Sequence, residues 1–236
     1  MELRIMSFNT QHCLNFLTRK IDFDSVADAV RGVGAHIVGL NEMRGAGTDP
    51  EYTAQTEILA EKLGYYSFFA KAIDVKGSNP YGNGLLSKYP ILSAEVIPIP
   101  DPVIRAYNGY YESRCVLKAR IDVPGGIVTV LVSHFGLNPD EQKNAVETVI
   151  GAMDARSCIF MGDLNVTPED SVLLPIRDKL FDTAELFGGK LLSFPSDEPD
   201  RKIDYIFTTR DVSVTEADIP EIVVSDHRPH LAVIHI

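Results

Sequence analysis

Cysteine is scarce in this sequence: Cys13, Cys115 and Cys158 are the only three. An odd number of cysteines without C-x-x-C spacing argues against both a disulfide framework and a zinc site. Cys158 lies within an apolar run at residues 157–161. We therefore expect it to be a small buried core residue and not a reactive thiol.

Long apolar runs are also absent. No stretch approaches the roughly 18 consecutive apolar residues that a membrane-spanning helix needs, so we expect no stable membrane insertion. Residues 1–5 lack the apolar core of a secretory signal and are typical of a first strand. Cytoplasmic placement is the default expectation, although a mature form with its signal removed would look the same.

The sequence has no excess of positive charge. Its formal net charge is −11 and its pI is near 5.0. A protein that grips long nucleic acid usually presents surplus Lys and Arg to the phosphates. The acidic balance disfavours a processive nuclease, leaves room for a local basic cleft, and suits a small phosphorylated substrate. We expect a monomer.

The 236 residues, 45% of them hydrophobic, are punctuated by Gly and Pro without a linker or repeat, which predicts one domain over residues 1–236. Helical spacing is present near residues 23–33, 52–63 and 140–153. Apolar runs at 3–8, 37–40 and 158–161 predict strands, and residues 114–133 predict a hairpin around Pro124-Gly125-Gly126. This mixture predicts an α/β fold with two packed sheets and helices outside.

Several predicted strands stop where acidic or amide residues begin. Asn9, the pair Asn41-Glu42, the motif Gly162-Asp163-Leu164-Asn165 and Asp226 all follow apolar runs. Such strand ends assemble a polar cluster at the rim of a sheet. Carboxylate and amide oxygens are the ligands that Mg²⁺ prefers, so the pattern predicts a divalent-metal site.

Asp163 and Asn165 are separated by one residue. If the chain stays extended there, both side chains point to the same face and could orient a water molecule. The alternative is an Asx turn that begins the next segment.

Two histidines also end strands. Asp226 and His227 are adjacent and would diverge in an extended segment, so that Asp226 faces a metal and His227 a phosphate. Asp204 is the candidate carboxylate that orients His227; its alternative is a solvent-exposed charge at a strand edge. His134 is a second candidate imidazole. Arg114 could neutralise a phosphate or pair with Glu112.

These strand ends belong to a series of seven motifs: Ser-Phe-Asn at 7–9, Asn-Glu at 41–42, Tyr-Gly-Asn-Gly-Leu-Leu-Ser-Lys-Tyr-Pro at 81–90, Ser-His-Phe at 133–135, Gly-Asp-Leu-Asn at 162–165, Lys-Ile-Asp-Tyr-Ile-Phe at 202–207 and Ser-Asp-His-Arg-Pro at 225–229. In this order the motifs resemble the endonuclease/exonuclease/phosphatase superfamily, which includes deoxyribonucleases, abasic-site endonucleases, neutral sphingomyelinases and inositol polyphosphate phosphatases. The resemblance implies a four-layer sandwich: two mixed sheets face to face, with helices on both outer faces.

The resemblance also implies residue roles. Glu42 matches the main metal ligand, with Asn9 and Asp226 close to a Mg²⁺ or Mn²⁺ ion. Asp163 and Asn165 match the pair that positions the nucleophilic water and the phosphate. The catalytic imidazole corresponds to His227, oriented by Asp204, and a second imidazole that contacts phosphate corresponds to His134.

One position departs from the deoxyribonuclease branch, where a Glu partners the first imidazole. Residues 77–80, before Tyr81, contain no acid. His134 is therefore predicted to donate a hydrogen bond to phosphate, alongside Asn165 and Arg114, without being a strong general acid.

The sequence thus predicts a metal-dependent phosphoester hydrolase, with a phosphodiesterase favoured. Its substrate is a small molecule, a lipid head group or a nucleic acid. A repair-type DNA nuclease and a sugar- or inositol-phosphate phosphatase remain alternatives. So does a non-catalytic binding module of the same fold, although such a module should have lost members of the set.

Overall fold

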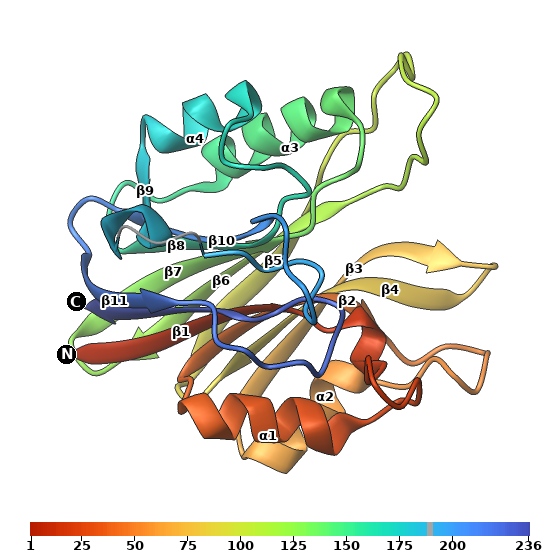
Figure 1. Ribbon diagram of the computed structural model, residues 1–236, viewed down its shortest axis with the longest axis horizontal. Helices are drawn as coiled ribbons and strands as arrows, with labels where there is room; N and C mark the ends of the chain where they lie inside the picture. Colours follow the sequence, from red (N-terminus) through yellow and green to blue (C-terminus); the bar gives the residue numbers. More distant parts are fainter. Residues whose placement is uncertain (188–190) are drawn as a thin grey trace.

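Two β-sheets of six strands each pack face to face in the computed structural model, which describes residues 1–187 and 191–236 (Figure 1). The first sheet has the strand order β11 (Ser213–Asp218), β12 (His230–His235), β1 (Glu2–Asn9), β2 (Ile37–Arg44), β4 (Asn79–Ser87) and β3 (Tyr66–Val75). The second has the order β5 (Ile91–Pro98), β6 (Cys115–Val123), β7 (Gly126–Ser133), β8 (Cys158–Asp163), β10 (Asp204–Thr209) and β9 (Leu180–Asp182). Both sheets are mixed, because β1–β2 and β7–β8 are parallel pairs among antiparallel neighbours.

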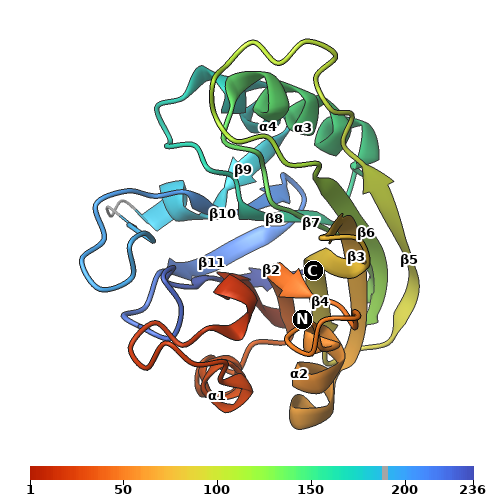
Figure 2. The same cartoon turned by 90° about the vertical axis from the view of Figure 1, so that its right-hand side faces the viewer.

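Helices cover both outer faces of the pair of sheets. In Figures 1 and 2, α1 (Phe23–Val33) and α2 (Gln55–Leu63) lie outside the first sheet, and α3 (Pro139–Ala152) and α4 (Leu174–Arg177) lie outside the second. Short 3₁₀ turns occur at Gln11–Cys13, Ser171–Leu173 and Thr183–Phe187. The predicted four-layer sandwich is confirmed. Among the described residues, no helix has the length and apolar character needed to span a bilayer.

The core follows from the alternation of side chains along each strand. In β1, Leu3 and Ile5 join the apolar cluster between the sheets, whereas Met6 and Phe8 join the cluster beneath α1 and α2. In β8, Met161 faces the other sheet while Phe160 packs beneath α3. Successive side chains of a strand point to opposite faces, so each strand contributes to two apolar layers.

The element boundaries agree closely with the predicted ones. Asp22 caps α1 by accepting the Ser25 amide at 3.0 Å, and Gly64 ends α2 in the left-handed conformation. However, α2 begins at Gln55 and not at Tyr52, because residues 49–52 form a turn closed by the Tyr52 amide and the Asp49 carbonyl at 2.9 Å. The strand β11 was not predicted.

Two glycines allow close backbone approach beside the polar strand ends. A Cβ atom on Gly39 would lie 2.6 Å from Met161 Sδ across the sheets. A Cβ atom on Gly162, which has φ +148°, would lie 1.8 Å from the Ser133 carbonyl oxygen on β7. Gly162 therefore sets the spacing of β7 and β8 next to His134 and Asp163.

Replacing Gly162 by Ala should lower the free energy of unfolding by roughly 3 kcal/mol, because the methyl group meets backbone that cannot turn aside. Urea unfolding followed by circular dichroism measures the change. The matched control is Gly32→Ala in α1, where nothing lies within 4 Å of the added Cβ. That variant should be neutral or up to about 1 kcal/mol more stable, as alanine favours a helix. Equal stability of the two variants would contradict the close approach at Gly162.

Candidate active site

The inward rows of side chains on several strands end in polar residues at one edge of the sandwich. Asn9 follows Leu3 and Ile5 on β1, and Asp163 follows Ile159 and Met161 on β8. By the same alternation His134 follows β7 and Asp204 begins β10. Because β1–β2 and β7–β8 are parallel, their carboxyl ends meet between the two sheets. This topology brings the predicted residues together.

Asp163 lies at the centre of the cluster and is 1% exposed. Its Oδ2 atom accepts Asn9 Nδ2 at 3.0 Å and lies 3.4 Å from His134 Nε2 and 3.6 Å from His227 Nε2. Burial raises the pKa of Asp163 to about 7, although the neighbouring His227 acts to lower it. One carboxylate oxygen therefore faces an amide and two imidazoles.

His227 and Asp204 form a buried pair. The Nδ1 atom of His227 lies 2.8 Å from Asp204 Oδ2, so Asp204 is not the solvent-exposed charge of the alternative interpretation. Burial acts to lower the pKa of His227, but the Asp204 and Asp163 carboxylates outweigh it and raise the pKa to about 10. His227 is therefore a cation at neutral pH, with its Nε2 side directed at Asp163.

His134 has a different partner. Arg114 Nη1 lies 3.0 Å from His134 Nδ1 and 2.8 Å from Glu112 Oε1. A guanidinium group only donates, so Nδ1 must accept and the single ring proton must be on Nε2. Burial, then Arg114 and His227, hold the pKa of His134 well below its usual value. His134 is therefore a neutral donor. Arg114 pairs with Glu112, which is one of its two predicted roles, and its role toward a phosphate stays a prediction.

Glu42, Asn9 and Asp226 lie on the first-sheet side of the cluster. Asn9 Nδ2 donates to Glu42 Oε1 at 3.1 Å, and its Oδ1 accepts the Gln11 amide at 3.1 Å. Burial raises the pKa of Glu42, and the charge of Asp226 adds to that effect. Gln11 Nε2 donates to Asp226 Oδ2 at 2.9 Å, while Gln11 Oε1 is buried and has no hydrogen-bond partner among the described residues.

The backbone at Asn165 does not have the extended conformation that was one of the two expectations. Its φ is +53° and its amide donates to Asp163 Oδ1 at 2.9 Å, which is the Asx turn of the alternative interpretation. The expectation of an extended chain was wrong because this turn ends β8 at Asp163. The turn nevertheless brings Asn165 to the cluster, where its Nδ2 donates to the Phe135 carbonyl at 3.0 Å. Asn165 Nδ2 also lies 3.1 Å from His134 Nε2, but with the ring proton on Nε2 both atoms are donors and this contact is not a hydrogen bond.

Four neighbours of the cluster were given no individual role from the sequence, although Asn41 was named there with Glu42 as a polar strand end. Asn41 joins the sheets: its Oδ1 accepts the Asp163 amide at 2.9 Å and its Nδ2 donates to the Ser133 carbonyl at 3.1 Å. Gln11 follows the predicted Asn9 by two residues, and Tyr81, which hydrogen-bonds Glu42, begins one of the motifs. Phe194 lies 4.7 Å from the His227 ring, and no sequence signal indicated it.

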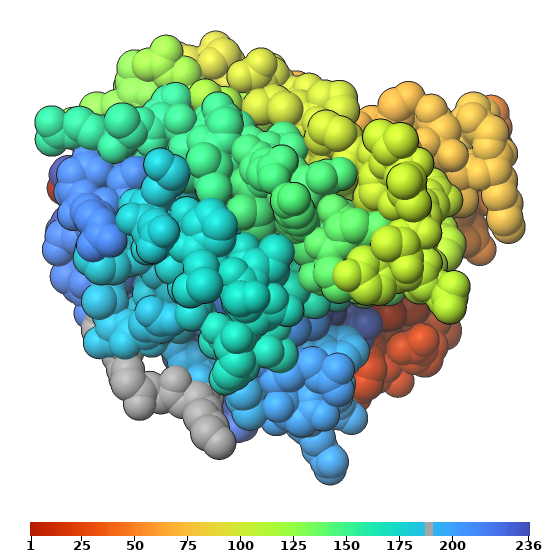
Figure 3. All heavy atoms as spheres, turned by 90° about the horizontal axis from the view of Figure 1, so that it is seen from above, coloured from red at the N-terminus to blue at the C-terminus, as the bar shows by residue number. Residues whose placement is uncertain are grey.

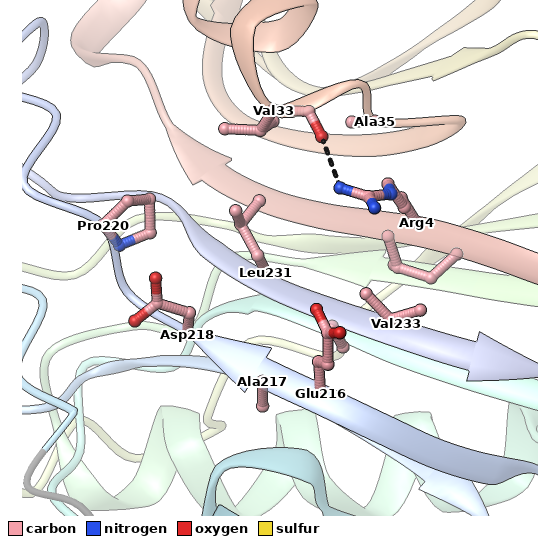
Figure 4. A pocket seen from close by; sticks show the side chains of 11 residues that line it. Arg4, Val33, Ala35, Glu216, Ala217, Asp218, Pro220, Leu231 and Val233 are labelled. Atoms are coloured by element: carbon pink, nitrogen blue, oxygen red, sulfur yellow. Dashed lines mark hydrogen bonds between the residues drawn. The ribbon is translucent and has the colours of Figure 1, made fainter.

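These residues line an open cleft of about 440 Å³. Its walls include the candidate residues Glu42, Arg114, His134, Asp163, Asn165, Asp226 and His227, together with Leu137, Thr167, Phe194, Arg201 and Ile203. A second hollow, of about 290 Å³, lies on the outer face of the first sheet beside the end of α1 (Figure 4). None of the predicted residues lines that hollow, where Arg4 Nη1 donates to the Val33 carbonyl at 3.5 Å. The cleft at the strand ends is therefore the candidate active site.

Comparisons with known proteins agree with this fold. The model of the Endonuclease/Exonuclease/phosphatase family matches residues 6–227. YbhP of Escherichia coli is 26% identical over 99% of this chain and 96% of its own length. Cwh43 of Schizosaccharomyces pombe is 28% identical over 77% of this chain, which spans only 17% of that protein. A solved endonuclease/exonuclease/phosphatase from Beutenbergia cavernae has a TM-score of 0.80 and 23% identity, covering 100% of this chain and 72% of that one. The chain therefore belongs to the endonuclease/exonuclease/phosphatase family.

Proposed function

We propose that this protein hydrolyses a phosphodiester with a divalent cation, Mg²⁺ or Mn²⁺, in the cleft around Asp163. The observation that carries the proposal is the position of Asp163 Oδ2, within 3.0–3.6 Å of Asn9 Nδ2, His134 Nε2 and His227 Nε2. A carboxylate with its pKa raised to about 7 is suited to take a proton from water near neutral pH. The two imidazoles supply donors for the phosphoryl oxygens.

The oxygen-rich side of the cluster suits the cation. Glu42 and Asp226 offer carboxylates, Asn9 stays a predicted ligand, and the buried Oε1 of Gln11 is an oxygen without a hydrogen-bond partner among the described residues. The ligand-capable atoms of Asp163, Asp204 and His227 also lie within 4.8 Å of one another, but there His227 Nδ1 is already bonded to Asp204. We therefore assign the cation to the Glu42 side. When bound, it would polarise the phosphoryl group and stabilise charge on the leaving oxygen.

The side chains of the cleft accept the proton of the water molecule and donate hydrogen bonds to the phosphate. Asp163 accepts the proton of the attacking water. The imidazolium of His227, held by Asp204, and the neutral Nε2–H of His134 donate to the phosphoryl oxygens as negative charge develops. Asn165 adds an amide donor beside His134. Donors that are already oriented in a buried site are typically worth about 3 kcal/mol each in the transition state.

The charges of the cleft favour a diester over a monoester. The dianion of a phosphomonoester needs more positive charge than a diester monoanion. Arg114 could supply it, but its guanidinium is paired with Glu112 at 2.8 Å. Glu42, Asp163, Asp204 and Asp226 add four carboxylates to the same region. The net charge of −11 likewise disfavours a long nucleic acid.

Hydrolysis of bis-p-nitrophenyl phosphate should require Mg²⁺ or Mn²⁺ and should exceed that of p-nitrophenyl phosphate. The substitution Asp163→Asn keeps the shape of the side chain but removes the base. It should lower kcat/KM for the diester by about a hundredfold or more. The measurement is release of p-nitrophenol with each metal. Wild-type turnover by Asp163→Asn, or a preference for the monoester, would contradict the proposal.

Replacing Asp204 by Asn should lower kcat/KM by on the order of a hundredfold, since His227 loses the carboxylate that holds its orientation and its charge. Removal of that negative charge should also lower the pKa of His227 from about 10. The high-pH limit of the activity profile should then move to lower pH. The pH profile of kcat/KM and the histidine nitrogen shifts in NMR spectra measure the two effects. An unshifted His227 titration would show that Asp204 is not its electrostatic partner.

Replacing Glu42 by Gln should weaken Mn²⁺ binding by at least about tenfold, because the cation loses a full negative charge from its main predicted ligand. Calorimetric titration with Mn²⁺ measures the affinity without reference to turnover. The matched control is Glu57→Gln on α2, which removes the same charge from an exposed position. Equal Mn²⁺ affinities in the two variants would overturn the assignment of Glu42.

A further inference from the structure

The connection between β5 and β6, residues 99–114, carries an apolar tip beside the candidate active site. Val103 is 102% exposed and Ile104 is 78% exposed, which makes them the two most exposed large apolar side chains of the described residues. Tyr107, Tyr110 and Leu137 are also exposed. In Figures 1 and 2 this connection projects beyond the end of α3, and in Figure 3 its yellow-green atoms stand at the surface next to the green α3. Isolated exposed apolar residues are ordinary, whereas a contiguous group is typical of a docking surface.

The base of this connection is firmly held. Tyr111 OH donates to Asp140 Oδ2 at 2.8 Å, and Asn138 Nδ2 donates to the Tyr110 carbonyl at 2.9 Å. Ser113 Oγ donates to Asp101 Oδ2 at 2.8 Å. These bonds tie the stem of the connection to the start of α3 and to itself. These hydrogen bonds fix the ends of the connection, and the side chains of Val103 and Ile104 are exposed to solvent and do not pack on the core.

The same segment is continuous with the cleft. It ends at Arg114, whose Nη1 lies 3.0 Å from His134 Nδ1. Leu137, three residues after His134, lines the cleft and is followed by Asn138, which holds Tyr110. The connection that carries Val103 and Ile104 therefore ends at the cleft, and Leu137 is an exposed apolar residue at the edge of the cleft.

The chemistry of the tip matches a lipid surface. Its two most exposed side chains, Val103 and Ile104, are β-branched aliphatics, and Tyr110 and Tyr107 are less exposed. Arg105 is the sole charged residue between positions 102 and 110, and the whole connection, with Asp101, Glu112 and Arg114, is formally neutral in a chain of net charge −11. Arg105 also stacks over the Tyr111 ring, with its Cζ atom 5.0 Å from the ring centroid. Aliphatic groups enter the acyl region, while tyrosine and arginine favour the head-group layer with its anionic phosphates.

Other occupants fit less well. Bases of nucleic acid stack on aromatic rings, but the leading side chains here are aliphatic. A stable protein interface needs about 800 Å² from each partner, which the tip of a narrow loop does not offer.

We propose that Val103 and Ile104 insert into a phospholipid surface and present the cleft to a phosphodiester of a lipid head group. The inference rests on the proposed phosphodiesterase function for its substrate, but the insertion itself is independent of catalysis.

Flotation with vesicles of phosphatidylcholine, alone and mixed with phosphatidylglycerol, tests the insertion. The double substitution V103S/I104S removes the aliphatic tip without changing charge and should weaken vesicle binding by about tenfold or more. It should leave hydrolysis of soluble bis-p-nitrophenyl phosphate unchanged. The matched control, Leu92→Ser, alters an exposed residue at the far end of β5 and should bind vesicles like the wild type.

The two proposals fail in different ways. Absence of wild-type vesicle binding, or equal binding by V103S/I104S, would overturn the lipid inference even if the soluble diester is hydrolysed. Loss of binding to a fluorescent oligonucleotide in V103S/I104S, with vesicle binding intact, would overturn it in favour of nucleic acid. If vesicle binding depends on the tip but no diester is hydrolysed, the phosphodiesterase proposal fails while the membrane contact stands.

Discussion

The burial of one carboxylate, Asp163, is the constraint on which the rest of this site depends. A buried carboxylate is costly unless hydrogen bonds and nearby positive charge compensate it. Here the compensation comes from both sheets: Asn9 donates from β1, Asn41 holds the Asp163 amide, and His134 and His227 face the same oxygen. The network therefore fixes the two sheets relative to each other at the edge where the cleft opens. Asp163 is thus both the candidate reactive group and a residue that joins the two sheets.

This constraint also explains why the two histidines differ in protonation. His227 has a carboxylate on each side, Asp204 and Asp163, so that the pKa rises in spite of burial. His134 has the guanidinium of Arg114 on one side, so that the pKa falls. The partner of His134 is thus a cation at the end of the β5–β6 connection, and Glu112 pairs with that cation in turn. His227 is therefore a charged donor and His134 a neutral one, because the two imidazoles have different charged neighbours.

Much of the fold and the membership of the cluster could be predicted because both follow from side-chain alternation. The inward rows Leu3-Ile5-Asn9 and Ile159-Met161-Asp163 are visible in the sequence as apolar positions of one parity that end in a polar one. The partners could not be predicted, because they depend on contacts between strands. From the sequence, Arg114 could neutralise a phosphate or pair with Glu112, and its contacts with Glu112 and His134 became known only from the structure. The turn at Asn165 depends on a local hydrogen bond to Asp163 that competes with strand extension. Phe194 reaches His227 from a segment with no recognisable pattern.

The position of the β5–β6 connection bears on why a single fold can serve many phosphoesters. The candidate active-site cluster is built on strand ends, where the hydrogen bonds between strands fix the backbone. Val103 and Ile104 lie on a connection that is held by hydrogen bonds to Asp101, Asn138 and Asp140, the last of which also accepts the Ala106 amide at 3.2 Å. Substitutions of Val103 and Ile104 should therefore leave the strand ends undisturbed, since the hydrogen bonds that hold the connection are made by backbone and polar side-chain atoms of other residues. Arg114 joins the two regions, because the residue that ends this connection also sets the proton position on His134. The proposed membrane contact therefore lies on this connection, whereas the proposed chemistry depends on the buried carboxylate of Asp163, which joins the sheets.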